Sequence, residues 1–136
     1  MATLKQLREG LATRLRTVDG LGQVSEYRLA NLMPPCAYIK VSKTERLAMG
    51  RHSVALRQVT FAVNVLMAAG LEEASQLKLD ELVDSGAIPD ALEADQTLGG
   101  VAGSVYVSGV SEYDPVSIGE NQAGWRATYE VLVTES

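Results

Sequence analysis

The stretch Val59-Thr-Phe-Ala-Val-Asn-Val-Leu-Met67 decides the fold, because its side chains alternate in character. One side of the extended chain would carry Val59, Phe61, Val63, Val65 and Met67, and the other Thr60, Ala62, Asn64 and Leu66. Successive side chains of a strand point to opposite faces, so this period of two predicts a strand with one face in the core. A strand of this kind needs partners, which the flanking segments supply.

Four further segments have the composition of strands, namely 23–32, 37–42, 101–113 and 125–134. In the last of them one face carries Trp125, Ala127, Tyr129, Val131 and Val133. Pro34 and Pro35 separate the first two, because proline has no amide hydrogen to donate to a neighbouring strand. Residues 114–124 are expected to connect the last two.

Three segments are predicted to be helical. Thr3 and Gln6 have the spacing of a capping box ahead of an amphipathic helix over 4–17. A second helix is expected over 71–84, with its carboxylates on the solvent-exposed face. A short third helix is expected over 88–93, with Pro89 at its first position, where the missing amide costs nothing.

The order helix, three strands, two helices, two strands predicts an α+β fold. We expect one domain over 1–136, with a mainly antiparallel sheet of four to five strands and two or three helices packed on one face. A chain of this length buries about 68% of the surface that its unfolded form exposes, so its core needs no disulfide or metal. The single Cys36 fits a reducing compartment. We see neither a secretory signal nor an apolar run long enough to span a bilayer, so we expect neither secretion nor membrane insertion.

The net charge of −5 conceals an uneven distribution. Residues 1–57 contain ten of the twelve Lys and Arg and four acids, which gives +6. Residues 58–136 contain the other two bases and thirteen acids, which gives −11. Such asymmetry fits a nucleic-acid surface, head-to-tail self-association, or two solvated faces that fold next to each other.

Residues 43–53, Lys-Thr-Glu-Arg-Leu-Ala-Met-Gly-Arg-His-Ser, are polar and irregular and lie between two predicted strands. We expect a mobile loop or an extended hairpin that is available to a partner. Its candidate interface residues are Lys43, Arg46, Met49, Arg51 and His52. No aromatic residue lies within 41–57, so this segment does not imply base stacking. The tyrosines outside it that could form a stacking platform, Tyr27, Tyr38 and Tyr106, are expected in the core.

Catalytic signatures are weak. Cys36 and His52 are the only residues of their kinds, so a Cys–His nucleophilic pair is the one enzyme hypothesis that the residues name. A lone Cys in an apolar strand more often packs as a small hydrophobe. One Cys and one His do not make a zinc site, and the glycines of 99–103 lack the spacing of a nucleotide-binding loop. We therefore expect no enzyme activity, no cofactor and no metal.

The segment Ser85-Gly-Ala-Ile-Pro-Asp-Ala-Leu-Glu-Ala-Asp-Gln-Thr-Leu-Gly-Gly-Val101 resembles the middle of the tail terminator (tail completion) proteins of long-tailed, non-contractile bacteriophages (siphophages), especially those that infect actinobacteria. Other parts agree in order with that family: residues 11–15 running into Gly20-Leu21, Pro34-Pro35 ahead of a strand, Met49-Gly50-Arg51 in a polar loop, and a last strand over 129–133.

The resemblance implies a small α+β virion protein that assembles as a ring, usually a hexamer, on the tail tube. It would stop tube polymerisation and offer a surface to head-completion (connector) proteins. Its partners would be its own copies, the major tail tube protein and a head-side protein, with genomic DNA passing through the lumen without sequence-specific binding. It would be assembled in the host cytoplasm and lie at the head-proximal end of the tail in the virion.

The ring needs contacts between two different patches of the subunit, which the +6 and −11 parts of the chain can supply. Two alternatives stay open. One is another head-to-tail joining protein, such as a head-closure or adaptor subunit. The other, more distant, is a small Cys/His enzyme or ligand-binding domain.

Overall fold

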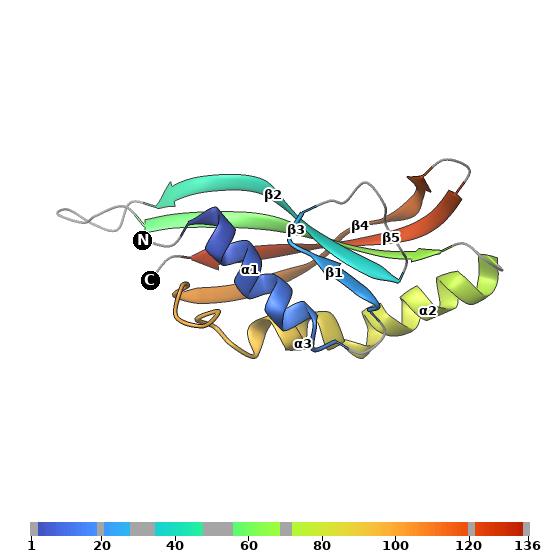
Figure 1. Ribbon diagram of the computed structural model, residues 1–136, viewed down its shortest axis with the longest axis horizontal. Coiled ribbons are helices and arrows are strands. Elements are labelled where there is room, and N and C mark those ends of the chain that lie inside the picture. The colour runs from blue at the N-terminus through green and yellow to red at the C-terminus, as the bar shows by residue number, and fades with distance from the viewer. Residues whose placement is uncertain are drawn as a thin grey trace.

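The computed structural model describes residues 3–18, 21–27, 35–47, 56–68, 72–119 and 122–134. Within these residues three helices and five strands follow one another (Figure 1): α1 (Leu4–Leu15), β1 (Gln23–Ser25), β2 (Cys36–Leu47), β3 (Leu56–Ala68), α2 (Glu72–Ser85), α3 (Ala87–Glu93), β4 (Ser104–Gly119) and β5 (Gln122–Thr134). The predicted α+β fold is confirmed.

One five-stranded sheet, in the order β1-β2-β3-β5-β4, forms the framework. β3 lies at its centre and pairs antiparallel with both β2 and β5. β4 pairs antiparallel with β5, whereas the short β1 runs parallel to β2. The sheet is therefore mainly antiparallel, as the sequence predicts.

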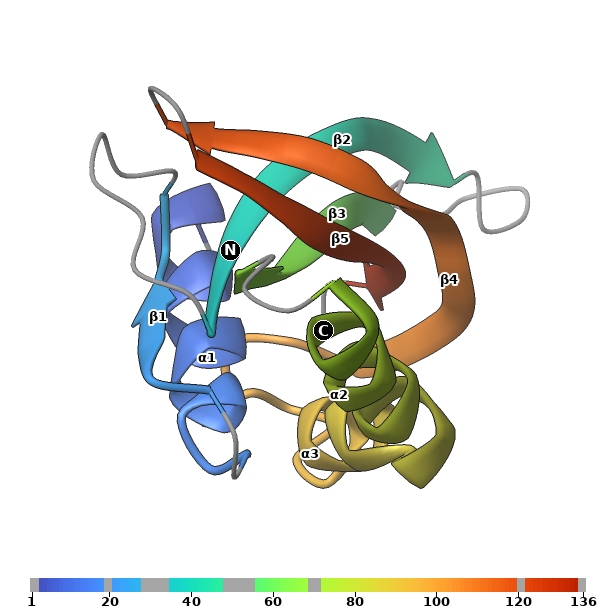
Figure 2. The ribbon, with the colours of Figure 1, turned by 90° about the vertical axis from the view of Figure 1, so that its right-hand side faces the viewer.

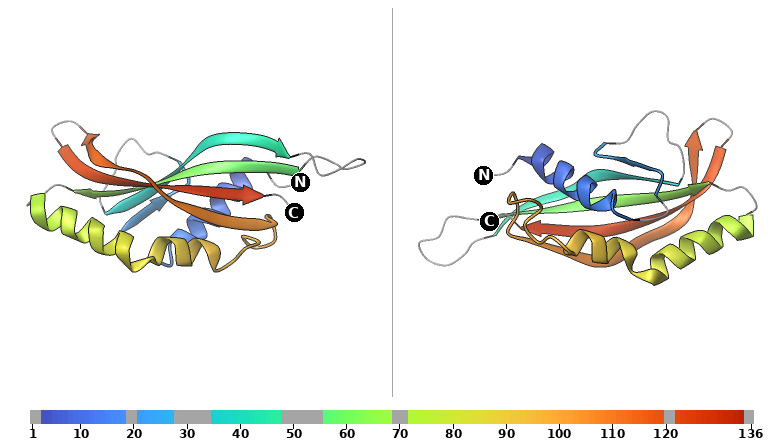
Figure 3. Two further views of the ribbon diagram at one scale, coloured as in Figure 1. Left: turned by 180° about the vertical axis from the view of Figure 1, so that it is seen from behind. Right: turned by 60° about the horizontal axis from the view of Figure 1, so that its bottom comes forward.

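The helices cover one face of the sheet and leave the other face open (Figures 2 and 3). Val59, Phe61 and Val63 of β3 belong to the covered face and are fully buried. The same core cluster contains Leu7, Leu11 and Leu15 of α1, Leu79 of α2, and Ile88 and Leu92 of α3. Burying one such side chain stabilises the fold by about 1.5–3 kcal/mol, so the alternation along β3 determines which face the helices cover.

The first helix begins with the predicted capping box. The Thr3 hydroxyl accepts a hydrogen bond from the Gln6 amide at 3.1 Å, and the Thr3 amide donates to the Gln6 side-chain oxygen at 2.9 Å. The helix ends at Leu15, two residues earlier than predicted. It ends there because the Thr17 and Val18 amides bond to carbonyls three residues back, which tightens the last turn.

α1 approaches the turn after α3 closely at Gly10. A Cβ at this position would lie 2.8 Å from the Leu98 Cβ and 3.2 Å from the Leu98 carbonyl oxygen. Glycine inside a helix is usually unfavourable, but here the missing side chain makes room for the turn. Leu98 itself has a φ of 48°. The contact joins the first helix to the segment that leads into β4.

Lys43 and Arg46 lie in an extended hairpin, one of the two predicted alternatives, and not in a loop. β2 runs to Leu47 and β3 begins at Leu56, so both residues belong to a long hairpin with a register from Lys43↔Thr60 to Leu47↔Leu56. Pairing with β3 satisfies the backbone of these polar residues, and backbone hydrogen bonds form whether or not the side chains are apolar. Of the two expectations for 43–53, the extended hairpin holds for 43–47, and residues 48–53 lie outside the described part of the chain.

The end of the chain also differs from the prediction. β4 runs from Ser104 to Gly119, so residues 114–119 are strand where a connection was expected, and residues 101–103 form a turn. Three irregularities in register let β4 follow β5 along this length. Pro89 is the third residue of α3, because the helix begins at Ala87, but it still lies in the first turn, where its amide needs no helical partner.

Candidate interaction surfaces

The predicted interface residues are only partly placed. Met49, Arg51 and His52 lie outside the described residues, and Arg46 is described only as a member of β2. Lys43 is exposed and forms an ion pair with Glu45, two residues further along the strand. This hydrogen-bonded carboxylate raises the pKa of the Lys43 ammonium. Lys43 is therefore partly neutralised by a carboxylate of its own strand.

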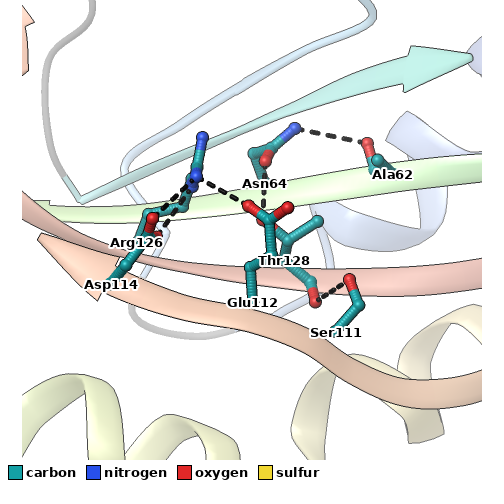
Figure 4. A network of polar contacts seen from close by, with 7 residues as sticks. All are labelled: Ala62, Asn64, Ser111, Glu112, Asp114, Arg126 and Thr128. Atoms are coloured by element: carbon teal, nitrogen blue, oxygen red, sulfur yellow. Dashed lines mark hydrogen bonds and ion pairs between the residues drawn. The ribbon is translucent and has the colours of Figure 1, made fainter. Parts of the chain in front are cut away.

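The open face of the sheet contains a polar groove of about 450 Å³. Four strands line it with Tyr38, Lys40, Val41, Ser42, Ala62, Asn64, Ser111, Glu112, Arg126 and Thr128. Asn64 and Thr128 are only 4% and 6% exposed. The Thr128 hydroxyl donates to the Asn64 side-chain oxygen at 2.8 Å, and the Asn64 amide donates to the Ala62 carbonyl at 3.5 Å (Figure 4). These bonds offset the cost of burying two polar side chains.

Arg126 joins β5 to the acidic residues of β4. Its Nε and Nη2 donate to the two carboxylate oxygens of Asp114 at 3.2 and 3.0 Å, and Nη2 also donates to Glu112 at 2.7 Å (Figure 4). Asp114 lies opposite Arg126 in the strand register. A two-pronged bond of this kind is directional, so the cluster fixes the pairing of β4 with β5.

Folding carries most of the two charge groups to different parts of the molecule, and they meet where α1 packs against α3, at the hydrogen bond from the Arg14 guanidinium to the Ala91 carbonyl (2.9 Å). α1 and β1 lie to one side of the molecule and α2 and α3 to the other (Figure 2), while β2 and β4 lie toward opposite edges of the sheet. The described residues within 3–47 contain seven Lys or Arg and three acids; residues 72–119 contain ten acids and one Lys. We call the surface of α1, β1 and β2 the basic side, and that of α2, α3 and β4 the acidic side.

Some cations of the basic side bond within the chain. The Arg8 guanidinium donates to the carbonyls of Glu26 and Ile39, both at 2.9 Å, and lies 4.4 Å from the ring centre of Tyr27. Arg16 pairs with the Glu26 carboxylate at 3.2 Å. A backbone hydrogen bond and the Arg16 guanidinium lower the pKa of the Glu26 carboxyl. These bonds hold the segment after β1 against α1.

Exposed apolar side chains lie on two elements of the acidic side, α2 and β4. Three of them are Leu77 of α2, which is 54% exposed, and Val110 and Tyr113 of β4, which are each 36% exposed. The Tyr113 hydroxyl donates to Asp80, one helical turn after Leu77, and its ring lies 6.4 Å from that of Trp125. We call Leu77, Val110 and Tyr113 the Tyr113 patch. Sequence reasoning missed it, although an apolar Leu77 on the wet face of an acidic helix was a visible signal.

Two of the three tyrosines expected in the core are exposed. Tyr27 is 51% and Tyr106 59% exposed, whereas Tyr38 is buried as predicted. Tyr27 follows the short β1 at one edge of the sheet, and Tyr106 is on β4 at the other. Strands at an edge have a neighbour on one side only, which leaves a large ring partly uncovered.

The free edge of β4 is unsuited to pairing with another strand. The amides of Val105 and Val107 donate to the side chains of Gln96 and Glu93, at 2.9 and 3.4 Å. Pro115 has no amide hydrogen, and three irregularities bend the strand. Edges that avoid strand addition have these features. A partner on the acidic side therefore binds through side chains.

Cys36 is fully buried, and burial raises the pKa of its thiol to about 11. The reactive thiolate is scarce at neutral pH, which argues against Cys36 as a nucleophile, and His52 lies outside the described residues. Across the described ranges, no group of three or more His, Cys, Asp or Glu is placed to hold a metal ion. In the same ranges, no helix has the length and apolar character needed to cross a membrane.

No protein-family model matches the chain. No curated protein matches it either. Among solved structures, a chain described as "Virion of native gene transfer agent (GTA) particle" matches with 15% identity and a TM-score of 0.38, over 99% of this chain and 92% of that one. At that score the likeness carries no inference about this protein.

Proposed function

We propose that this protein is a structural component of a bacteriophage virion, a tail terminator that forms a ring on the end of the tail tube. The ring would end tube polymerisation and offer the surface to which a head-side protein binds. The resemblance of 85–101 and of the flanking motifs to tail terminator proteins motivates this choice. The separation of opposite charges onto two sides of the folded chain is the observation that carries it.

A closed ring needs two different, mutually complementary surfaces on each subunit. The basic side and the acidic side are of opposite sign, and their outermost strands, β1 and β4, form the two edges of one sheet. Opposite charges steer two copies together in one orientation, and like charges disfavour the contact of two equal sides. Screening lengths at physiological salt are about 8 Å, so such steering weakens as salt rises.

The function we propose is binding, with no chemical step. Its partners are further copies of the chain, the major tail tube protein and a head-completion protein, and genomic DNA passes through the lumen. An acidic lumen wall would repel the phosphate backbone and keep the DNA from adhering.

The test uses the full chain and tubes that assemble from the major tail tube protein. We expect light scattering or electron microscopy to show closed rings, either of the chain alone or on tube ends, and the family resemblance implies hexamers. We also expect tubes to stop growing when the chain is added. A strict monomer that leaves tube length unregulated contradicts the proposal. Binding to a head-side protein without binding to tubes would instead indicate a head-closure or adaptor subunit.

Charge reversal tests the two sides separately. One variant changes the exposed Glu81 and Asp84 of the acidic side to Lys, and a second changes the exposed Lys5 and Lys40 of the basic side to Glu. We expect neither variant to assemble alone, because both of its sides then have the same sign. An equal mixture should assemble, because the two variants can alternate around the ring and each contact then joins a positive side to a negative one. Glu9→Lys, which reverses one charge but makes the basic side more positive, is the control that leaves assembly intact. Assembly of both reversed variants alone, as well as the wild type, contradicts the role of charge.

A further inference from the structure

We infer, on the basis of the proposed ring, that the Tyr113 patch is the docking surface for a second copy of this chain, and that it receives Tyr27 on the basic side of that copy. Charge alone steers two surfaces together, but affinity at protein contacts comes mainly from a few buried aromatic and apolar anchors. The Tyr113 patch and Tyr27 are anchors of this kind on the two oppositely charged sides.

Tyr113 is held in place before any partner arrives. Its hydroxyl donates to Asp80 on α2, and its ring contacts Trp125 on β5, so β4, α2 and β5 together orient it. A side chain that is already fixed loses little conformational freedom when it becomes buried in a contact. Tyr113, which is 36% exposed, is therefore a preformed surface.

Acidic residues of α2 flank the apolar side chains. One face of α2 carries Leu77 and, at intervals of three to four residues, Asp80, Glu81 and Asp84. The carboxylates therefore lie on the same side of the helix as Leu77. The charge of Asp84 also acts on the Tyr113 hydroxyl. An apolar centre with a charged rim is the usual arrangement of a specific protein contact.

Tyr27 offers the matching surface. Its ring is 51% exposed, and the Arg8 guanidinium lies against it at 4.4 Å from the ring centre. Arg16, bonded to Glu26, lies on the same side. An aromatic ring among cations is complementary to an apolar patch among carboxylates. Two Tyr113 patches, by contrast, would bring acids against acids.

The position of these anchors fits a ring. Tyr27 follows β1 and Tyr113 is on β4, and these strands are the two edges of the sheet. A contact between them is head to tail, so it repeats from copy to copy. Because the β4 edge resists strand addition, the copies meet through side chains, which fits a contact built on exposed rings and Leu77.

Cysteine cross-linking tests this pairing. We mix a Leu77→Cys variant with a Tyr27→Cys variant and add a short bifunctional maleimide; Cys36 is buried and stays unreacted. We expect a cross-linked dimer in the mixture and none from either variant alone. The double variant should give a ladder that ends at the ring size. Tyr106→Cys replaces Leu77→Cys in the control, because Tyr106 is as exposed but lies outside the patch, and should give no dimer.

A second measurement avoids cross-linking. Leu77→Ser and Tyr113→Ser, checked for an unchanged fold by circular dichroism, should each weaken self-association roughly 30-fold, the effect of losing a strong anchor. Tyr106→Ser should leave it unchanged. Rings that form normally from the Leu77 and Tyr113 variants, or cross-links equal to those of the Tyr106 control, overturn this inference and leave the proposed ring standing. Failure of the wild-type chain to form rings or stop tubes overturns the ring itself.

Discussion

Replacing Gly10 with Ala tests how closely α1 packs against the turn at Leu98. In an ordinary helix interior this substitution stabilises by about 1 kcal/mol. Here the new Cβ would lie 2.8 Å from the Leu98 Cβ and 3.2 Å from the Leu98 carbonyl oxygen, whereas carbon atoms in good contact are about 3.5–4.0 Å apart. Both atoms belong to or adjoin the backbone, so a rotamer change cannot relieve the clash. Overpacking of this kind costs about 1–3 kcal/mol, which leaves a net loss of about 1 kcal/mol.

Urea titration of both proteins, followed by circular dichroism and the fluorescence of Trp125, measures this loss. Leu98→Gly supplies the control, because it removes the Cβ that clashes and suits the φ of 48° at that position. In that background only the contact with the carbonyl oxygen at 3.2 Å remains, so Gly10→Ala should cost clearly less than in the wild-type chain, and the two changes are coupled. If Gly10→Ala stabilises the wild-type chain by about 1 kcal/mol, as in an ordinary helix, the close approach of α1 to the turn is refuted.

Three further predictions concern buried and titratable groups. Thr128→Val should cost about 1–3 kcal/mol in equilibrium unfolding, because it leaves the buried Asn64 amide oxygen unpaired. Tyr129→Phe should be neutral or stabilising, because the buried Tyr129 hydroxyl has no hydrogen-bond partner among the described residues. Equal effects of the two substitutions contradict this. Cys36 should react with a thiol reagent at pH 7 only after denaturation, and rapid reaction of the native protein is the contrary result. The Thr97 hydroxyl and backbone amides lower the pKa of the Asp95 carboxyl, so its contribution to stability is present above its unfolded pKa of about 3.9 and is lost as the pH falls. Asp95→Asn should therefore flatten acid unfolding below about pH 4, and an unchanged profile would count against it.

The sequence predicts the elements whose cause is local. Alternation along 59–67 identifies β3 and its buried face, and the spacing of Thr3 and Gln6 identifies the start of α1. Both signals arise within one element, where the period of side chains and the spacing of hydrogen-bonding groups are fixed by the backbone itself. The burial of Cys36 follows in the same way from its apolar neighbours in β2.

Features that depend on distant segments were not predictable in this way. Lys43 looks like a loop residue until its pairing with Thr60 is known, because the backbone hydrogen bonds of a strand form whether or not its side chains are apolar. Gly10 has no visible role until Leu98 approaches it. The candidate surface depends on the same kind of information, since Tyr113 and Asp80 are 33 residues apart in the chain.

The central pairing of the sheet has a consequence for how the chain folds during synthesis. β3 lies beside β5, and a hydrogen bond between Asn64 and Thr128 spans 64 residues of sequence. The ribosome makes α2, α3 and β4 before β5. Until then, one backbone edge of β3 is unpaired and its apolar side chains, from Val59 to Met67, are not fully covered. Pairings of such sequence separation form slowly, and an exposed strand is prone to aggregate meanwhile. Yield in the cell should therefore depend on chaperones that shield residues 59–67 until β5 has been made.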